Sequence, residues 1–232
     1  MSLFYSFRKL IRQVRIYPWN KHSFNRKAEP GLLISELFEK IKHIPGWFNV
    51  DDCVHFYLIL EMQSHLGVTG DLLEIGSYFG RSAAMLGYCI KSEEKLVVCD
   101  AFQGGLDYTT GEHPSPEVLI RNVQKVAPNV DRNRIVIHAT RSEHLELKKS
   151  RKLRFAHVDG GHSKAECLHD LESCAPHMIS HGVIAVDDYA HYRFPGVVEA
   201  VETFRRHHPE YYVLADLNRH GAAGRKIYLQ RN

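Results

Sequence analysis

Asp71-Leu-Leu-Glu-Ile-Gly-Ser-Tyr-Phe-Gly-Arg-Ser82 is the stretch that decides the fold of this chain. Its first part, Leu72 to Gly76, is short, mostly apolar and ends in a glycine, which predicts a buried strand. A tight loop from Gly76 to Gly80 follows, and then a run of small residues that predicts a helix. A strand that turns sharply into a helix presents free backbone N–H groups and the positive end of a helix dipole, which suit a carboxylate or a phosphate. The alternative is an ordinary strand–turn–helix unit that binds no ligand.

The glycine spacing of this loop favours a nucleotide-like ligand without a pyrophosphate. Tyr78 stands where a dinucleotide fingerprint has its second glycine, the one that lets a pyrophosphate approach the backbone. A second predicted strand, 95–100, ends in an acid about twenty residues past the loop, where a carboxylate holds ribose hydroxyls. Asp100 is therefore a candidate ribose ligand, and the alternative is a cap at the end of the strand.

From residue 71 onward, apolar strands alternate with helices. This pattern predicts an α/β fold with a Rossmann-like, mostly parallel seven-stranded sheet and helices on both faces. The last two strands are joined by residues 218–221 without a helix, so we expect an antiparallel C-terminal hairpin. The expected strands are 71–76, 95–100, 134–138, 153–159, 182–188, 210–216 and 225–230, and the expected helices are 80–91, 115–127, 142–149, 163–179 and 196–208.

Residues 68–232 are expected to form this domain, and residues 1–67 to form N-terminal helices. The segment 31–67 has apolar residues at helical spacing, is broken by Pro45-Gly46 and starts again near Asp51 and Asp52, one of which we expect to cap the second helix. These accessory helices are placed to wall a substrate pocket.

The first thirty residues are strongly basic. They carry seven Lys and Arg against one Glu, a net charge of +6, whereas the whole chain carries +3. Phe4, Phe7, Ile11 and Val14 lie at helical spacing, which predicts a basic amphipathic helix. It either lies on an anionic membrane surface or docks on the domain or on a second subunit, and we favour docking or contact in a homo-oligomer. Specific nucleic-acid binding is not expected, because the rest of the chain is slightly acidic and carries no recognition module.

Composition also limits where the protein acts. No uninterrupted apolar run approaches the ~20 residues of a membrane span, and the start of the chain lacks the apolar core of a signal peptide. Five cysteines are scattered without Cys-x-x-Cys spacing, which is typical of buried free thiols in a reducing compartment. We therefore expect a cytoplasmic protein, with a peripheral membrane position as the alternative.

Acids follow two later strands. Phe155-Ala-His-Val precedes Asp159, and Gly182-Val-Ile-Ala-Val precedes Asp187 and Asp188. Parallel strands bring their carboxyl ends to one edge, where three carboxylates repel each other unless a cation joins them. Hard oxygen ligands select Mg²⁺, Ca²⁺ or Mn²⁺, so these three aspartates are candidate metal ligands. The alternative is that Asp187 caps a helix, Asp188 faces water and Asp159 meets the cofactor alone.

The segment 103–116 is long, polar and rich in glycine. Loops of this length are commonly functional or disordered. We expect it to form a lid over the ligand, and the alternative is a passive surface loop.

Four motifs together carry a family resemblance: Glu74-Ile-Gly-Ser-Tyr-Phe-Gly-Arg-Ser82, Asp100 with Phe102 and Gly104-Gly-Leu106, Val158-Asp-Gly-Gly-His162, and Val186-Asp-Asp-Tyr189. Over residues 70–232 the chain resembles class I S-adenosylmethionine-dependent methyltransferases. It is most similar to the metal-dependent O-methyltransferase branch that includes macrocin-type sugar methyltransferases.

This resemblance implies methyl transfer from S-adenosylmethionine to a hydroxyl of a small molecule, sugar or glycan, assisted by Mg²⁺ or another divalent cation. It implies that the loop residues bind the methionine part, Asp100 the ribose and Ser142 the adenine, and that Asp159 lies near the cofactor and binds the metal with Asp187 and Asp188. The loop residues concerned are Glu74, Gly76, Ser77, Tyr78, Gly80 and Ser82.

The chain departs from the family at the expected base. Sugar-methylating relatives often have an acid two residues after the first metal aspartate, and here that position is Gly161. His162 is the nearest substitute, so His162 and Asp159 are the candidate catalytic residues. The alternative for His162 is a structural histidine bonded to the following helix. Two other functions stay open, a nicotinamide-dependent oxidoreductase and a non-catalytic partner protein on the same fold.

Overall fold

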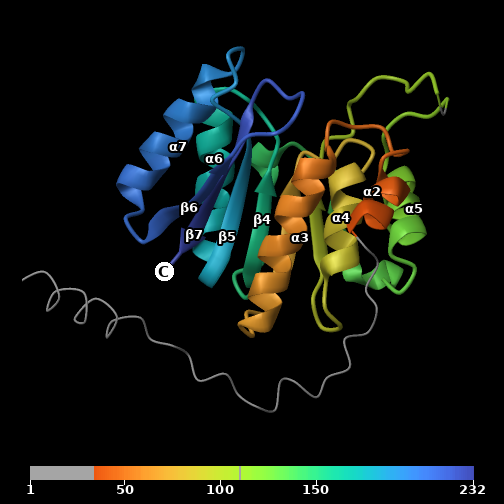
Figure 1. Ribbon diagram of the computed structural model, residues 1–232, viewed down its shortest axis with the longest axis horizontal. Coiled ribbons are helices and arrows are strands. Elements are labelled where there is room, and N and C mark those ends of the chain that lie inside the picture. Colours follow the sequence, from red (N-terminus) through yellow and green to blue (C-terminus); the bar gives the residue numbers. More distant parts are fainter. Residues whose placement is uncertain (1–33, 110) are drawn as a thin grey trace, which may run out of the picture. The chain divides into compact units, whose positions relative to one another are not determined.

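The computed structural model describes residues 34–109 and 111–232, and its centre is a seven-stranded sheet (Figure 1). In chain order the strands are β1 (Asp71–Ile75), β2 (Leu96–Cys99), β3 (Ile135–His138), β4 (Leu153–Val158), β5 (Met178–Tyr189), β6 (Tyr211–Leu217) and β7 (Arg225–Arg231). They lie in the order β3-β2-β1-β4-β5-β7-β6. Neighbours from β3 to β5 are parallel, and β7 is antiparallel to both β5 and β6. The predicted Rossmann-like sheet with an antiparallel C-terminal hairpin is therefore confirmed.

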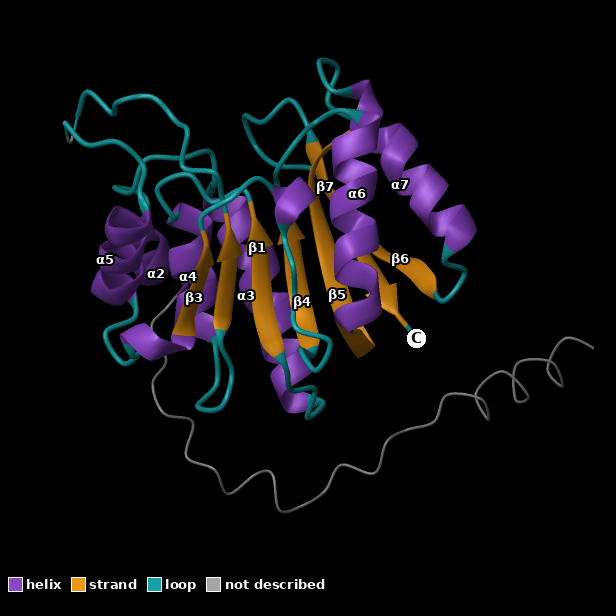
Figure 2. Ribbon diagram, turned by 180° about the vertical axis from the view of Figure 1, so that it is seen from behind, coloured by secondary structure: helices purple, strands orange, loops and turns teal. Residues whose placement is uncertain are grey.

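Helices cover both faces of this sheet (Figures 1 and 2). In β2, Leu96 and Val98 pack in one hydrophobic cluster, and Val97 and Cys99 pack in the other. A strand buried on both faces reads as a continuous apolar run, because successive side chains point to opposite faces. One face is covered by α2 (Ile34–Ile41), α3 (Val50–His65), α4 (Arg81–Cys89) and α5 (Pro116–Val126), and the other by α6 (Lys164–Cys174) and α7 (Pro195–His207).

The strands β1, β2 and β4 end in register beside Val186 of β5, and this alignment creates the functional edge of the sheet. Ile75 of β1 is paired with Cys99 of β2 and with Val158 of β4, and Val158 is paired with Val186 of β5. The next residue on each strand is therefore at the same carboxyl edge. Those residues are Gly76, Asp100, Asp159 and Asp187.

Three predicted element boundaries are wrong. Residues 142–149 form only a 3₁₀ turn at Ser142–His144, because the apolar residues Leu145 and Leu147 are two apart, which is not helical spacing. The helix expected over 163–179 ends at Cys174, close to Pro176, which has no backbone N–H to continue it. A 3₁₀ turn at Ala175–His177 follows, and β5 starts at Met178 instead of at the expected residue 182.

The cap of α3 is also corrected. It is Asn49, not Asp51 or Asp52: the Asn49 side chain accepts from the Asp52 N–H, and the Asp52 carboxylate accepts from the Asn49 N–H. This reciprocal capping box turns Asp52 inward, where it is fully buried. It therefore becomes available to the functional edge.

Helices α2 and α3 share one hydrophobic cluster with α4, α5 and the sheet. The boundary predicted between residues 67 and 68 stays a prediction, and the basic amphipathic helix predicted within residues 1–30 lies outside the described residues. Over residues 34–109 and 111–232, no helix has the length and apolar character to cross a bilayer. The five cysteines are all buried and none forms a disulfide, as predicted.

Candidate active site

A cavity of about 850 Å³ opens at the carboxyl edge of the sheet. Segments far apart in the sequence line it. They are the loop before α4, Asp159 after β4, the acids near the end of β5, the α2–α3 turn (residues 42–49) and the hairpin loop between β6 and β7 (residues 218–224). The predicted site residues that line it are Gly76, Ser77, Tyr78, Ser82, Asp100, Asp159, His162, Asp187 and Asp188. A second cavity of about 490 Å³ shares Gly76, Asp100 and Asp159 and adds Ser142. The four separated sequence motifs thus converge.

The loop after β1 needs glycine at its first position. Gly76 has φ +82°, and a Cβ built on it would lie 2.0 Å from the backbone oxygen of Asp159. A side chain at this position would therefore push β1 and β4 apart where their ends meet. The absence of a Cβ therefore lets the ends of β1 and β4 lie close together at the floor of the cavity.

Asp100 holds this loop in place. Its Oδ2 accepts from the backbone N–H groups of Ser77 (2.6 Å) and Tyr78 (2.7 Å), and its Oδ1 accepts from Phe102 N–H (2.6 Å). The predicted ribose ligand lies in the cavity, and it also fixes the conformation of the loop. Its ribose role stays a prediction.

Glu74 and Gly80 lie behind the loop rather than on the cavity wall. Glu74 is fully buried; its Oε2 accepts from the Ser77 hydroxyl (2.7 Å), and its Oε1 lies 2.8 Å from His157 Nδ1. A Cβ on Gly80, where φ is +86°, would lie 2.7 Å from Leu119 Cγ. Both residues therefore shape the loop from beneath, and their role in binding the methionine part of the cofactor stays a prediction.

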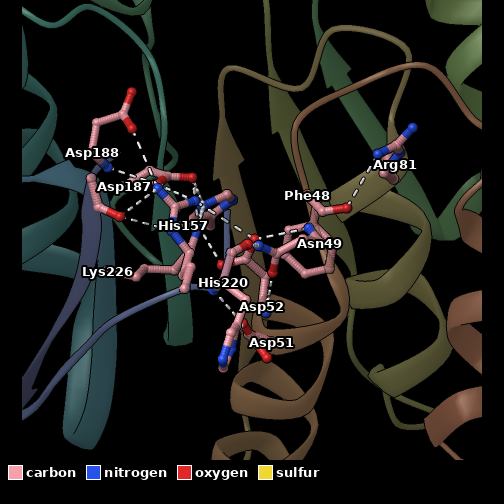
Figure 3. Close-up of polar contacts among 12 residues, drawn as sticks. Phe48, Asn49, Asp51, Asp52, Arg81, His157, Asp187, Asp188, His220 and Lys226 are labelled. Carbon is pink, nitrogen blue, oxygen red and sulfur yellow. Dashed lines mark hydrogen bonds and ion pairs between the residues drawn. The ribbon is translucent and has the colours of Figure 1, made fainter. Parts of the chain in front are cut away.

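Asp187 is the centre of a buried network of charges that Figure 3 shows in part. Its Oδ2 accepts from the Lys226 ammonium (2.6 Å), and its Oδ1 lies 2.8 Å from Arg219 Nη1. Burial alone would raise the pKa of Asp187, but Lys226, His157 and Arg219 outweigh it and hold that pKa far below its usual range. Asp187 is therefore an ionised carboxylate that the chain's own cations neutralise.

His157 connects this network to the loop. Its Nε2 lies 3.0 Å from Lys226 Nζ, and its Nδ1 faces Glu74. An ammonium group can only donate, so Nε2 accepts and the proton of a neutral imidazole sits on Nδ1, where Glu74 accepts it. A continuous chain of hydrogen bonds thus runs from Ser77 in the loop to Asp187.

His162 and Asp188 form a pair on the cavity wall. His162 Nε2 lies 3.1 Å from Asp188 Oδ2, and the imidazole stacks on the Phe194 ring with centroids 4.0 Å apart. The hydrogen bond with Asp188 raises the pKa of His162 against the opposing effect of burial. Position 161 has no room for an acid, because a Cβ on Gly161 would lie 2.5 Å from Glu166 Cβ. His162 is bonded to Asp188 and not to the helix that follows it.

Asp159 has no hydrogen-bonding side-chain partner among the described residues. Burial, and then the negative charge of Asp187, raise the pKa of Asp159 well above its usual range. Asp159, His162 and Asp188 offer donor atoms that all lie within 4.8 Å of one another, and so do His157, Asp159 and Asp187. The donor types suit a divalent cation in the first group, while the second already holds the Lys226 ammonium.

The rest of the cavity wall joins segments from opposite ends of the domain. Arg81 of α4 donates to the backbone oxygens of Lys42 (3.1 Å), Ile44 and Phe48 (3.2 Å), and so holds the α2–α3 turn over the loop. The hairpin loop is fastened to the start of α3, because His220 N–H donates to Asp51 Oδ2 (2.6 Å), as Figure 3 shows. The accessory segment thus lines the cavity, chiefly through the α2–α3 turn, and its role as the wall of a substrate pocket stays a prediction.

The loop expected to be a lid contributes little to either cavity. Of residues 103–109 and 111–116, Gln103 lines the second cavity, and a bridge between Asp107 and Glu112 is the regular structure of this segment. Its closing over the ligand stays a prediction.

A family model described as a methyltransferase domain matches residues 73–189. The chain belongs to this methyltransferase family. The S-adenosylmethionine-dependent methyltransferase predicted from the sequence is therefore confirmed at the level of the family and the fold. No curated protein sequence matched the chain.

Solved O-methyltransferase structures share the fold of this methyltransferase. The O-methyltransferase NovP is 18% identical with a TM-score of 0.60, covering 85% of this chain and 88% of NovP. An O-methyltransferase from Bacillus cereus in complex with SAH is 13% identical, with a TM-score of 0.58 and coverage of 91% and 96%. TomG from Streptomyces achromogenes, in complex with SAM, is 12% identical, with a TM-score of 0.57 and coverage of 91% and 94%.

Sequence reasoning missed several residues of the methyltransferase site. His157 lies in the mostly apolar strand β4, Lys226 lies in β7 beside the apolar run Ile227–Leu229, and both side chains are fully buried. Such a position is a detectable signal, because a charge inside a buried strand requires a partner. Arg219 gave no comparable signal, because it lies in a loop where an arginine is ordinary.

Proposed function

We propose that this methyltransferase moves the methyl group of S-adenosylmethionine to a hydroxyl of a small molecule or sugar. The observation that supports this most is one cavity that joins the glycine loop to the His162–Asp188 pair. NovP, TomG and the Bacillus cereus protein are titled O-methyltransferases, and another solved relative, CalS11, 16% identical, is titled a TDP-rhamnose 3'-O-methyltransferase.

Positioning of the donor is the first task of the site. A sulfonium is already a good methyl donor, so in-line transfer requires mainly alignment and an activated oxygen. The loop fixed by Asp100 and Glu74 would hold the methionine part of the donor, and Ser142 in the adjoining cavity would lie near the adenine.

His162 would take the proton from the acceptor hydroxyl. Asp188 is bonded to Nε2, and Nδ1 has no hydrogen-bond partner within the described part of the chain. Asp188 would orient the imidazole and stabilise the imidazolium that forms, and the Phe194 ring would fix its plane. Nδ1 is thus the atom at which we place the proton.

The proposal also includes a divalent cation, but its ligands differ from the three aspartates that the sequence led us to expect. Asp159 and Asp188 would hold it at the edge of the cavity, because Asp159 has no partner in the described residues and Asp188 lies within reach. When bound, Mg²⁺ or Mn²⁺ lowers the pKa of a coordinated hydroxyl. Asp187 is already bonded to two cationic side chains.

Transfer of a labelled methyl group tests this function. Wild-type protein, His162→Gln and Asp188→Asn are incubated with methyl-labelled S-adenosylmethionine and a panel of sugars, glycosides and phenols. We expect labelled product from the wild type and at least about a 100-fold lower rate from His162→Gln, with unchanged binding of S-adenosylhomocysteine. Equal rates for wild type and His162→Gln would exclude His162 as the base.

A binding comparison separates the alternative functions. Calorimetry with S-adenosylmethionine and NADH should give heat of binding with the first alone. Binding of NADH alone would favour the oxidoreductase, and binding of neither would favour a non-catalytic partner protein. A cytoplasmic location, a homo-oligomer and a peripheral membrane contact through residues 1–30 remain parts of this proposal, supported by sequence alone.

A further inference from the structure

We propose that the Lys226 ammonium serves as the cation partner of Asp187 at the acidic edge, which is the edge of the sheet that carries Asp159, Asp187 and Asp188. A divalent ion then gains Asp187 as a ligand only when this ammonium is removed. This deepens the divalent-cation part of the proposed function. Its test measures ion binding rather than methyl transfer, so the two proposals can fail separately.

The sheet topology places Lys226 beside Asp187. Strand β7 inserts next to β5 and runs antiparallel to it, with Ile227 paired to Val186. The residue before Ile227 therefore lies next to the residue after Val186. A C-terminal hairpin segment thus delivers a cation to the point where a parallel strand delivers its acid.

The surroundings of the ammonium form a complete binding site for it. Lys226 is fully buried, and its Nζ lies 2.6 Å from Asp187 Oδ2, 3.0 Å from His157 Nε2 and 3.7 Å from Asp52 Oδ1. The Phe48 and Phe56 rings lie with their centroids 5.7 Å and 5.3 Å from Nζ. Two carboxylates, an imidazole and two aromatic faces are the partners that a desolvated ammonium requires.

The other oxygen of Asp187 is also occupied. Its Oδ1 lies 2.8 Å from Arg219 Nη1 and accepts from the Asp188 backbone N–H at 2.7 Å. An ionised carboxylate has about four acceptor sites, and the structure fills three of them with Lys226, Arg219 and this N–H. A divalent ion on Asp187 would therefore have to lie next to a buried ammonium and a guanidinium.

Electrostatics then divides the two groups of possible ligands. His157 and Asp187 both bind Lys226, so their group with Asp159 repels a second cation at close range. Asp159, His162 and Asp188 form the group that Lys226 does not contact, and the cation that reaches it is Arg219, whose Nη2 lies 3.3 Å from Asp188 Oδ1. In the wild type an ion at the edge would use Asp159 and Asp188 of this group, and it would use Asp187 as well once the Lys226 ammonium is removed.

Titration with Mn²⁺ followed by electron paramagnetic resonance tests this. Lys226→Met keeps an unbranched apolar side chain against the two rings, and we expect it to bind Mn²⁺ at least about tenfold more tightly than the wild type. Lys226→Gln is the second variant, to be used if the Lys226→Met protein does not fold. Lys164→Met is the matched control, since it removes an exposed lysine at the start of α6, and should change the affinity less than about twofold.

Substitution of Asp187, the carboxylate that binds Lys226, tests the same proposal. Introduced alone, Asp187→Asn should leave the Mn²⁺ affinity within about twofold of the wild type. Combined with Lys226→Met, it should abolish the gain in Mn²⁺ affinity that Lys226→Met produces. Binding of S-adenosylhomocysteine by each variant reports whether the fold is retained. The proposal is overturned if folded Lys226→Met and Lys226→Gln bind Mn²⁺ no more tightly than the wild type, or if Asp187→Asn alone removes wild-type binding.

Discussion

Replacing Asp100 with alanine should weaken cofactor binding mainly by releasing the glycine loop. The carboxylate accepts from three backbone N–H groups, and two of these belong to Ser77 and Tyr78 in the loop. A hydrogen bond to a charged acceptor contributes ~1.5–3 kcal/mol. Water can replace part of the lost pair at this half-buried site, so we expect ~2–3 kcal/mol of binding free energy to be lost.

That loss corresponds to a rise in Kd of about 30- to 150-fold, since ~1.4 kcal/mol is tenfold. Calorimetry with S-adenosylhomocysteine measures it directly, and urea unfolding of the same samples shows how much of the loss is general destabilisation. Asp100→Asn is the matched control. Its amide keeps one oxygen for Ser77 and Tyr78 but turns an NH₂ toward the N–H of Phe102, so it should weaken binding about tenfold. A Kd for Asp100→Ala within threefold of wild type would refute this account of the loop.

Three further predictions concern stability and assembly. Gly76→Ala should lower the free energy of unfolding by ~2–5 kcal/mol, because the new Cβ would lie 2.0 Å from a backbone oxygen. Gly67 has φ +72° and no atom within 4 Å of an added Cβ, so Gly67→Ala should lower the free energy of unfolding by only ~1 kcal/mol. Urea unfolding measures both. Burial raises the pKa of Asp170 to about 6, so the contribution of Asp170 to wild-type stability should fall as pH rises from 4 to 7. The Asp170→Asn variant should therefore be ~1–3 kcal/mol more stable than the wild type at pH 7.5 and no more stable near pH 3.5. Urea unfolding at both pH values measures this difference. Deleting residues 1–30 should lower the number of chains per particle measured by light scattering, and it should leave pelleting with anionic vesicles unchanged. Pelleting that requires these residues would instead support membrane contact.

The sequence predicts the donor side of the site well because that side depends on local patterns. A short apolar strand followed by glycine or aspartate is visible in the chain, and parallel strands must bring such ends to one edge. This reasoning placed Gly76, Asp100, Asp159 and Asp187 together, and the register of the strands confirms it.

The electrostatic state of the site was not predictable in the same way. Three gathered acids suggested an external cation, because the positions of Lys226 and Arg219 depend on how the last strand inserts into the sheet. The sequence shows a hairpin, but it does not show that β7 lies between β5 and β6. Asp52 was hidden for a related reason, since its side chain turns inward only through the capping box with Asn49.

The fastening of the hairpin loop to the start of α3 has a consequence for engineering this enzyme. The two segments that it joins, residues 42–49 and 218–224, form the outer wall of the larger cavity, and they come from opposite ends of the domain. They meet through Asn49, Asp51 and His220, so they form one exchangeable unit. Transplanting both segments together from a relative would test whether acceptor choice moves with them, whereas transplanting one alone would leave its former partner without its hydrogen bonds.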